Sequence, residues 1–297
     1  MNWIILALIA PFLWAIGSVI SKFIRVKYIQ SVIGYLVVVA PACLFSLLFL
    51  FFGKFEFPPN NIFIYLLLSG ITAVIAYYLF ILALHQEEIS TAIIIYGTVP
   101  LFTLLLATLF LKELLRTQDY IAFALIIIGT FMVSFKKIEE KLRLSKEAIL
   151  ILISSFLFAT QSIFLKLSEK VNFTSAMIIR EIAFGGVILL IFLSSNKVRI
   201  KANEMWSKFS KKSILIVYFA EILGIIGIGF SYLALQRAPV SLVALLEGFE
   251  APFVLVIALF ISRFFPKILK EEIKTKTITI KIISIILMVG GLYLIAT

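Results

Sequence analysis

Long apolar runs alternate with short polar stretches along the chain. A helix needs about 20 apolar residues to cross a hydrocarbon core about 30 Å thick, and ten of the runs approach that length. They cover residues 3–23, 29–52, 62–84, 89–111, 120–135, 148–167, 173–194, 214–235, 240–262 and 277–296. The runs are continuous and show no period-two alternation, so they predict helices rather than strands. We therefore expect an all-α integral membrane protein with ten transmembrane helices.

The composition agrees with a membrane protein and argues against other classes. Of the 297 residues, 62% are hydrophobic and 14% are charged, whereas a soluble domain of this length keeps more polar residues for its surface. The net charge of +11 can indicate nucleic-acid binding, but the basic residues lie in short loops between apolar runs. We expect these residues to meet anionic membrane lipids, and we expect no nucleic acid as a partner.

Scarce residue types limit the chemistry that the chain can perform. The single cysteine, Cys43, has no partner for an intrachain disulfide, and the single histidine, His85, excludes a multi-histidine metal site. The sequence also lacks a Gly-rich phosphate loop and a Gly-x-Ser-x-Gly motif. We therefore expect no cofactor, no metal site and no enzymatic activity.

The second part of the chain repeats features of the first part in the same order. The matches align 11–23 with 155–167, 83–90 with 234–241, Gly97 with Gly248, and 126–133 with 288–295. In the first match, PFLWAIGSVISKF aligns with SFLFATQSIFLKL, and the shared positions include polar residues. Apolar helices often look alike, but a common order with polar matches favours a true duplication. We expect two five-helix repeats, residues 1–137 and 138–297.

The odd number of helices in each repeat has a geometric consequence. If residues 1–137 cross the membrane five times, residues 138–297 enter it from the opposite side, and the two halves are inverted relative to each other. Inverted repeats are typical of secondary transporters, in which the substrate site lies near the membrane midplane where the halves meet.

Basic residues are divided unevenly between the two faces of this predicted bundle. Most of the 27 lysines and arginines lie in the loops after the first, fifth, seventh and ninth apolar runs. One of these loops is KKIEEKLRLSKE at 136–147, which joins the two repeats. Cytoplasmic loops carry an excess of lysine and arginine, so this face is predicted to be cytoplasmic and both termini external.

The opening segment at 11–23 and the segment VPLFTLLLATLFLKELLRTQDYIAFALIIIGTFMV at 99–133 resemble the drug/metabolite transporter superfamily, and within it the EamA-type ten-helix permeases. The resemblance extends over essentially the whole chain, although ISRFFPKILKEEIKTKT at 261–277 lacks the glutamate-bearing turn that contains Glu113 in the first half. It implies secondary transport, often export of amino acids, related metabolites or drugs. Many relatives have cytoplasmic termini, unlike the orientation that the charges predict. Glu113 itself is expected to be structural, either capping a helix or pairing with Arg116.

Ionisable residues inside the apolar runs form the candidate site. Each costs about 2.5–3.5 kcal/mol to insert at the membrane centre, so it should face a cavity or an ionic partner. Glu247 and Glu250 stand three residues apart and share a helix face. Arg180 and Glu181 are adjacent, and we expect them to point in different directions. With Glu221, these residues are expected to bind a cationic or zwitterionic substrate or to carry a proton, the alternative being a structural ion pair between Arg180 and one glutamate.

Semi-polar side chains inside the runs extend this candidate set. They are Trp14, Tyr78, Tyr96, Gln161 and Tyr232. Aromatic residues at such positions more often pack against other helices or face lipid. However, Trp14 and Gln161 lie in corresponding first helices of the two repeats, and Tyr96 is equivalent to Glu247. This correspondence favours a central cavity that the two halves share.

Three functions compete at this point. The favoured one is a multi-pass secondary transporter of the cytoplasmic membrane, which exports a small-molecule substrate by alternating access and uses a coupled proton. An integral membrane enzyme acting on lipid-linked substrates would need a catalytic cluster at headgroup level, where only His85, Glu87 and Glu88 are available. A scaffold or receptor would need neither inverted repeats nor carboxylates at the midplane.

Overall fold

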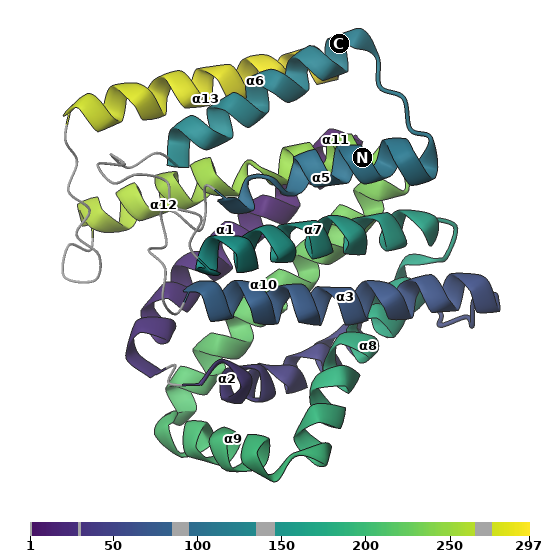
Figure 1. The fold of residues 1–297 in the computed structure, drawn as a ribbon, viewed down its shortest axis with the longest axis vertical. Coiled ribbons are helices and arrows are strands. Elements are labelled where there is room, and N and C mark those ends of the chain that lie inside the picture. Colours follow the sequence, from purple (N-terminus) through teal and green to yellow (C-terminus); the bar gives the residue numbers. More distant parts are fainter. Residues whose placement is uncertain (1, 29–30, 85–94, 135–145, 265–274) are drawn as a thin grey trace.

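The computed structural model describes residues 2–28, 31–84, 95–134, 146–264 and 275–297, and most of these residues are helical. Among the residues in these ranges no strand occurs, in agreement with the continuous apolar runs. Figure 1 shows many of the helices lying side by side along one direction, with both termini on the right-hand side of the view.

The described part of the chain contains fourteen helical segments. Those of the first half are α1 (Trp3–Tyr28), α2 (Val32–Val39), η1 (Ala40–Phe51), α3 (Asn60–Leu84), α5 (Val99–Leu106), η2 (Ala107–Leu111) and α6 (Thr117–Ser134). Those of the second half are α7 (Lys146–Leu167), α8 (Phe173–Ser194), α9 (Asn196–Lys208), α10 (Lys211–Leu235), α11 (Val240–Glu247), α12 (Glu250–Phe264) and α13 (Thr275–Ala296).

Seven spans among the described residues are long and apolar enough to cross a membrane. Three shorter apolar helices, Val99–Leu111, Thr117–Met132 and Ile282–Ala296, fall in the predicted runs 89–111, 120–135 and 277–296. Large apolar side chains such as Leu190 and Phe260 are exposed on the outer surface, as lipid contact requires. The prediction of an all-α membrane protein is confirmed, while ten membrane crossings stay a prediction.

Two of the predicted helices change character partway along their run. The run 29–52 begins as α2 and continues from Ala40 as the 3-10 helix η1, with Pro41 near its start. Proline has no backbone N–H and clashes with the preceding turn of an α-helix. The α-helix therefore gives way to the 3-10 helix next to Pro41. The run 240–262 is divided into α11 and α12.

Helix α9 was not predicted from the sequence. It lies in the stretch after Ser194 that we expected to be a loop. Because it contains many charged residues, it does not form an apolar run. Its buried residues are Val198, Ala202 and Met205, which recur at helical spacing and pack against α2 and α8. The helix is therefore amphipathic, with one side against the bundle.

Glycines bring α6 and α13 into close contact. A Cβ atom on Gly129 would lie 2.8 Å from the carbonyl oxygen of Ser284, and one on Gly291 would lie 2.9 Å from the carbonyl oxygen of Ala122. Any larger residue would push the two backbones apart, so glycine is required at both positions. The two helices lie side by side at the edge of the bundle (Figure 1).

Glu113 connects the two halves of the chain by capping α11. Its carboxylate accepts hydrogen bonds from the backbone N–H groups of Val240, at 3.0 Å, and Ser241, at 3.2 Å, and from the Ser241 hydroxyl. These N–H groups belong to the first turn of α11 and have no partner within the helix. Of the two predicted roles, capping is confirmed, whereas Arg116 pairs with Asp119 instead of Glu113.

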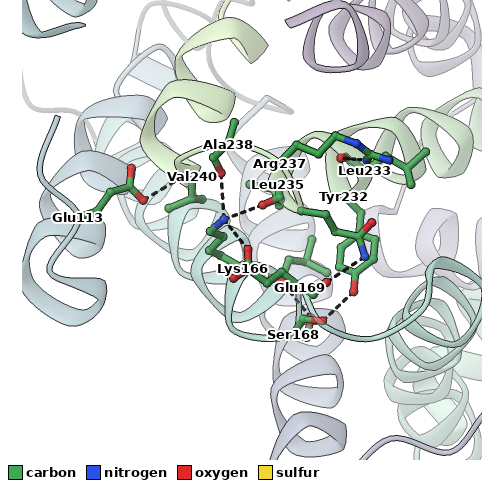
Figure 2. A network of polar contacts seen from close by, with 12 residues as sticks. Glu113, Lys166, Ser168, Glu169, Tyr232, Leu233, Leu235, Arg237, Ala238 and Val240 are labelled. Atoms are coloured by element: carbon green, nitrogen blue, oxygen red, sulfur yellow. Dashed lines mark hydrogen bonds and ion pairs between the residues drawn. The ribbon is translucent and has the colours of Figure 1, made fainter. Parts of the chain in front are cut away.

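Lys166 binds the other side of the same junction (Figure 2). Its ammonium group donates to the carbonyl oxygens of Leu235, at 2.7 Å, and Ala238, at 2.9 Å, and pairs with Glu169 at 2.5 Å. The carbonyl groups at the end of α10 thereby gain partners that the helix cannot supply. The turn between α10 and α11 is thus fixed from both halves.

Replacing Gly129 with alanine is expected to lower the melting temperature of the purified protein. The added methyl group must displace the backbone of α13, and overpacking of this kind costs about 1–3 kcal/mol. Gly290→Ala is the matched control, because a Cβ atom there meets nothing within 4 Å. Equal melting temperatures for the two variants would contradict the close helix contact.

Replacing Glu113 with alanine is expected to destabilise the protein, because the loss of an N-terminal helix cap costs about 0.5–2 kcal/mol. Glu113→Gln keeps one acceptor oxygen and should lose less stability than Glu113→Ala. Thermal unfolding followed by circular dichroism measures both variants. An alanine variant as stable as the unaltered protein would show that the cap contributes nothing.

Candidate functional site

Two carboxylates lie at a break within an apolar segment. Helix α11 ends at Glu247 and α12 begins at Glu250. Glu247 accepts a hydrogen bond from the hydroxyl of Ser231, on α10, at 2.6 Å, and Glu250 accepts one from Ser18, on α1, at 2.7 Å. The break therefore joins side chains from three parts of the bundle, and each carboxylate has a serine donor from another helix.

A second break occupies the equivalent place in the first half. Residues 97–98 form a turn just before α5, as residues 248–249 do just before α12. Tyr96 precedes the first turn as Glu247 precedes the second, and it lies within electrostatic reach of both carboxylates. Its ring also contacts that of Phe158 on α7, with centroids 5.6 Å apart. The structure thus brings Tyr96 and the two carboxylates of the predicted set together.

Arg180 and Glu181 form a buried ion pair on α8. The expectation that these neighbours point in different directions is wrong, because both side chains are long enough to converge and pairing lowers the cost of burying two charges. Arg180 also donates to the side-chain oxygen of Gln161 at 3.0 Å and lies over the ring of Phe184. Its Nε atom has no hydrogen-bond partner among the described residues.

Helix α7 places these two groups of residues next to each other. Phe158 and Gln161 are three residues apart and so share a face of α7. Phe158 contacts Tyr96, and Gln161 contacts Arg180. The group around the helix break and the ion pair of α8 therefore lie along one side of the same helix.

Glu221 on α10 forms a third polar group. The hydroxyls of Tyr35 and Tyr77 lie 3.3 Å and 3.5 Å from its carboxylate and donate to it. Tyr35 was not among the predicted residues, although it is a tyrosine within an apolar run like Tyr78 and Tyr96, which were. Ser18 could have been selected, because the alignment of the repeats pairs it with Ser162 as a shared polar position within an apolar run.

The three remaining predicted residues make other contacts. The indole N–H of Trp14 donates to the carbonyl oxygen of Gly224 at 3.2 Å and so binds α1 to α10. The hydroxyl of Tyr232, which is fully buried, donates to the carbonyl oxygen of Ser168 at 2.7 Å (Figure 2). This bond holds the turn after α7. Tyr78 lines a cavity beside α9.

Two cavities lie away from the helix break. One of about 560 Å³ adjoins α9, and one of about 570 Å³ adjoins Glu113 and Lys166. A central cavity shared by the halves stays a prediction. Within the described ranges, no three His, Cys, Asp or Glu side chains group together to hold a metal ion. The alternative catalytic residues, His85, Glu87 and Glu88, lie outside the described residues.

Comparisons with known proteins agree with the resemblance in the sequence. A family model described as the EamA-like transporter family matches residues 1–135. No curated protein matches the chain. Among solved structures 29 chains match, and one of them, the crystal structure of a protein 13% identical in sequence, has a TM-score of 0.71 over 98% of this chain and 95% of that chain. At this identity the likeness shows the fold alone. Residues 1–135 thus match the EamA-like transporter family of the drug/metabolite transporter superfamily, and the chain is a multi-pass membrane protein.

Proposed function

We propose that this protein is a secondary transporter that exports a small metabolite by alternating access across the cytoplasmic membrane. The observation that carries the proposal is the pair of carboxylates, Glu247 and Glu250, at the break between α11 and α12. A carboxylate at membrane depth is costly. Broken helices of this kind form the substrate and ion sites of many transporters, where freed backbone groups and polar side chains line the pathway.

The site residues fit a substrate that carries an amine, such as an amino acid, a related compound or a cationic drug. Glu247 and Glu250 supply negative charge, and the ring of Tyr96 offers an aromatic face to a cation. Arg180, whose Nε lacks a partner among the described residues, is suited to the carboxylate of a zwitterion. A proton bound by Glu247 or Glu250 on one side of the membrane would be released when an amine takes its place. This exchange would couple export to a proton gradient.

Alternating access of this type needs two inverted halves, and contacts between α6 and α13 support that arrangement. Gly129 meets Ser284, and Gly291 meets Ala122. In the alignment of the repeat ends, Gly129 corresponds to Gly291 and Ala122 corresponds to Ser284. The contact between Gly129 and Ser284 is therefore the counterpart of the contact between Gly291 and Ala122. The contacts also run in opposite directions along the two helices. Equivalent helices are antiparallel in an inverted repeat and parallel when the repeats share one orientation.

Contacts between other helices also occur as pairs that the repeat alignment relates to each other. The backbone of Gly17 in α1 approaches the carbonyl oxygen of Ala220 in α10. Ser69 in α3 donates to the carbonyl oxygen of Gln161 in α7 at 3.3 Å. The repeat alignment pairs Gly17 with Gln161 and Ala220 with Ser69, so the two contacts are equivalent. A two-fold relation between the halves requires such pairs.

The transport proposal predicts the effect of removing each charge without changing side-chain size. Glu247→Gln and Glu250→Gln are each expected to abolish transport, or its dependence on a pH gradient, with yield and melting temperature close to normal. The measurement is flux in liposomes for a panel of labelled amino acids and drugs, with and without a pH gradient. Glu147→Gln, in the first turn of α7, is the control and should transport normally.

A purely structural role for the carboxylates gives a different result. In that case the glutamine variants melt at a lower temperature, and the protein that survives still transports. If both variants transport normally at every pH tested, Glu247 and Glu250 are not the coupling site, and Glu221 and Glu181 become the next residues to test.

As a second part of the proposal, α9 lies in the cytoplasm and the turn after α7 lies outside the cell, which the distribution of lysine and arginine favours. In a Cys43→Ser background, Asn203→Cys on α9 is expected to resist an impermeant thiol reagent added to intact cells, whereas Lys170→Cys is expected to react. Both native side chains are exposed. The opposite labelling pattern would put both termini in the cytoplasm, as in many relatives.

A further inference from the structure

A stripe of charged residues on α9 lines the cavity of about 560 Å³. The stripe consists of Lys197, Lys201, Glu204 and Lys208, whose spacing of three to four residues puts them on one side of the helix. Another side of α9 packs against α2 and α8, so the stripe is held in place beside the opening. Three lysines with one glutamate give the lining a net positive charge.

The opposite wall of the cavity belongs mainly to membrane spans and is largely apolar, with Val32, Ile33 and Leu82 beside the hydroxyl-bearing Ser31 and Tyr78. Val32 begins the span Val32–Phe51, and Leu82 lies one residue before the end of the span Asn60–Ala83. Two spans therefore end at this cavity, which lies at the boundary between hydrocarbon and water. Figure 1 shows α9 beside α2 at the bottom of the view, separate from the helix break.

We propose that this cavity binds the headgroup of one anionic phospholipid, with the phosphate against the lysines and the first carbons of the acyl chains against the apolar wall. Basic side chains just outside a membrane span attract anionic lipids. A free phosphate ion would engage the lysines but leave the apolar wall without a partner, so a lipid accounts for both sides of the lining. The inference rests on the membrane location of the chain and does not depend on the transport proposal.

The test uses the full-length protein in detergent and measures lipid binding by native mass spectrometry. Short-chain phosphatidylglycerol, short-chain phosphatidylcholine and glycerol phosphate are titrated in parallel. We expect one retained phosphatidylglycerol and weaker binding of the other two. The triple variant Lys197→Gln, Lys201→Gln, Lys208→Gln should bind phosphatidylglycerol roughly a hundredfold more weakly, because each basic residue near an anionic headgroup contributes about fivefold.

A matched control separates the cavity from general surface charge. The triple variant Arg199→Gln, Lys211→Gln, Lys212→Gln removes the same charge from exposed residues outside the lining, and it should bind phosphatidylglycerol like the unaltered protein. Glu204→Gln removes the one acidic group of the stripe and should bind more tightly, a gain that misfolding cannot produce.

Three outcomes would overturn the proposal. Equal loss of binding in the two triple variants would assign the effect to net charge. Equal binding of phosphatidylcholine would remove the role of the anionic headgroup. Binding of glycerol phosphate as tight as that of phosphatidylglycerol would show that a soluble anion, and not a lipid, occupies the cavity.

Discussion

In lipid a polar group has no water to bind, so its hydrogen bonds must be made within the protein. Most buried polar side chains of this bundle follow that constraint, whereas the hydroxyls of Ser46 and Ser155 and the Nε of Arg180 have no hydrogen-bond partner among the described residues. The hydroxyl of Ser154 donates to the carbonyl oxygen of Ala76 on a neighbouring helix at 2.8 Å, and that of Thr103 donates to the carbonyl oxygen of Val99 one turn earlier at 3.0 Å. Helix breaks and buried charges are tolerated only where other helices bring donors and acceptors to them, which explains why polar residues of this chain occur in groups.

The same constraint joins the two halves. The first turn of α11 needs acceptors, and Glu113 supplies them from the first half. Between α11 and α12, Ser231 and Ser18 supply donors to the two carboxylates, and Ser18 again comes from the first half. Ser231 satisfies Glu247 from within the second half, whereas the first turn of α11 and Glu250 receive partners from the first half. The candidate site is therefore a property of the assembled bundle, and the junctions at both ends of α11 position it.

Much of the fold could be predicted from the pattern of apolar runs, because a membrane span requires both length and hydrophobicity and both are visible in the sequence. Capping was one of the two roles that the sequence left open for Glu113. Helix α9 could not be found in this way, since it is amphipathic and has few apolar residues.

Side-chain partners were harder to predict, because they depend on distances between helices. The pairing of Arg180 with its neighbour Glu181 depends on side-chain rotamers and on the burial of both side chains, and neither can be read from the order of residues. The serine and tyrosine donors to the glutamates depend on which helices meet, so they emerged only with the packing of α1, α2, α3 and α10.

The 3-10 helix η1 makes the second span longer than an α-helix with the same number of residues. A 3-10 helix rises about 2.0 Å per residue and an α-helix about 1.5 Å, so the 12 residues of η1 cover about 24 Å rather than about 18 Å. With the 8 residues of α2, the segment reaches about 36 Å, which exceeds a hydrocarbon core of about 30 Å and requires tilt or local bilayer thickening. Rewinding η1 into an α-helix would shorten it by about one helical turn. The 3-10 winding therefore lets a segment of 20 residues cross the hydrocarbon core with length to spare.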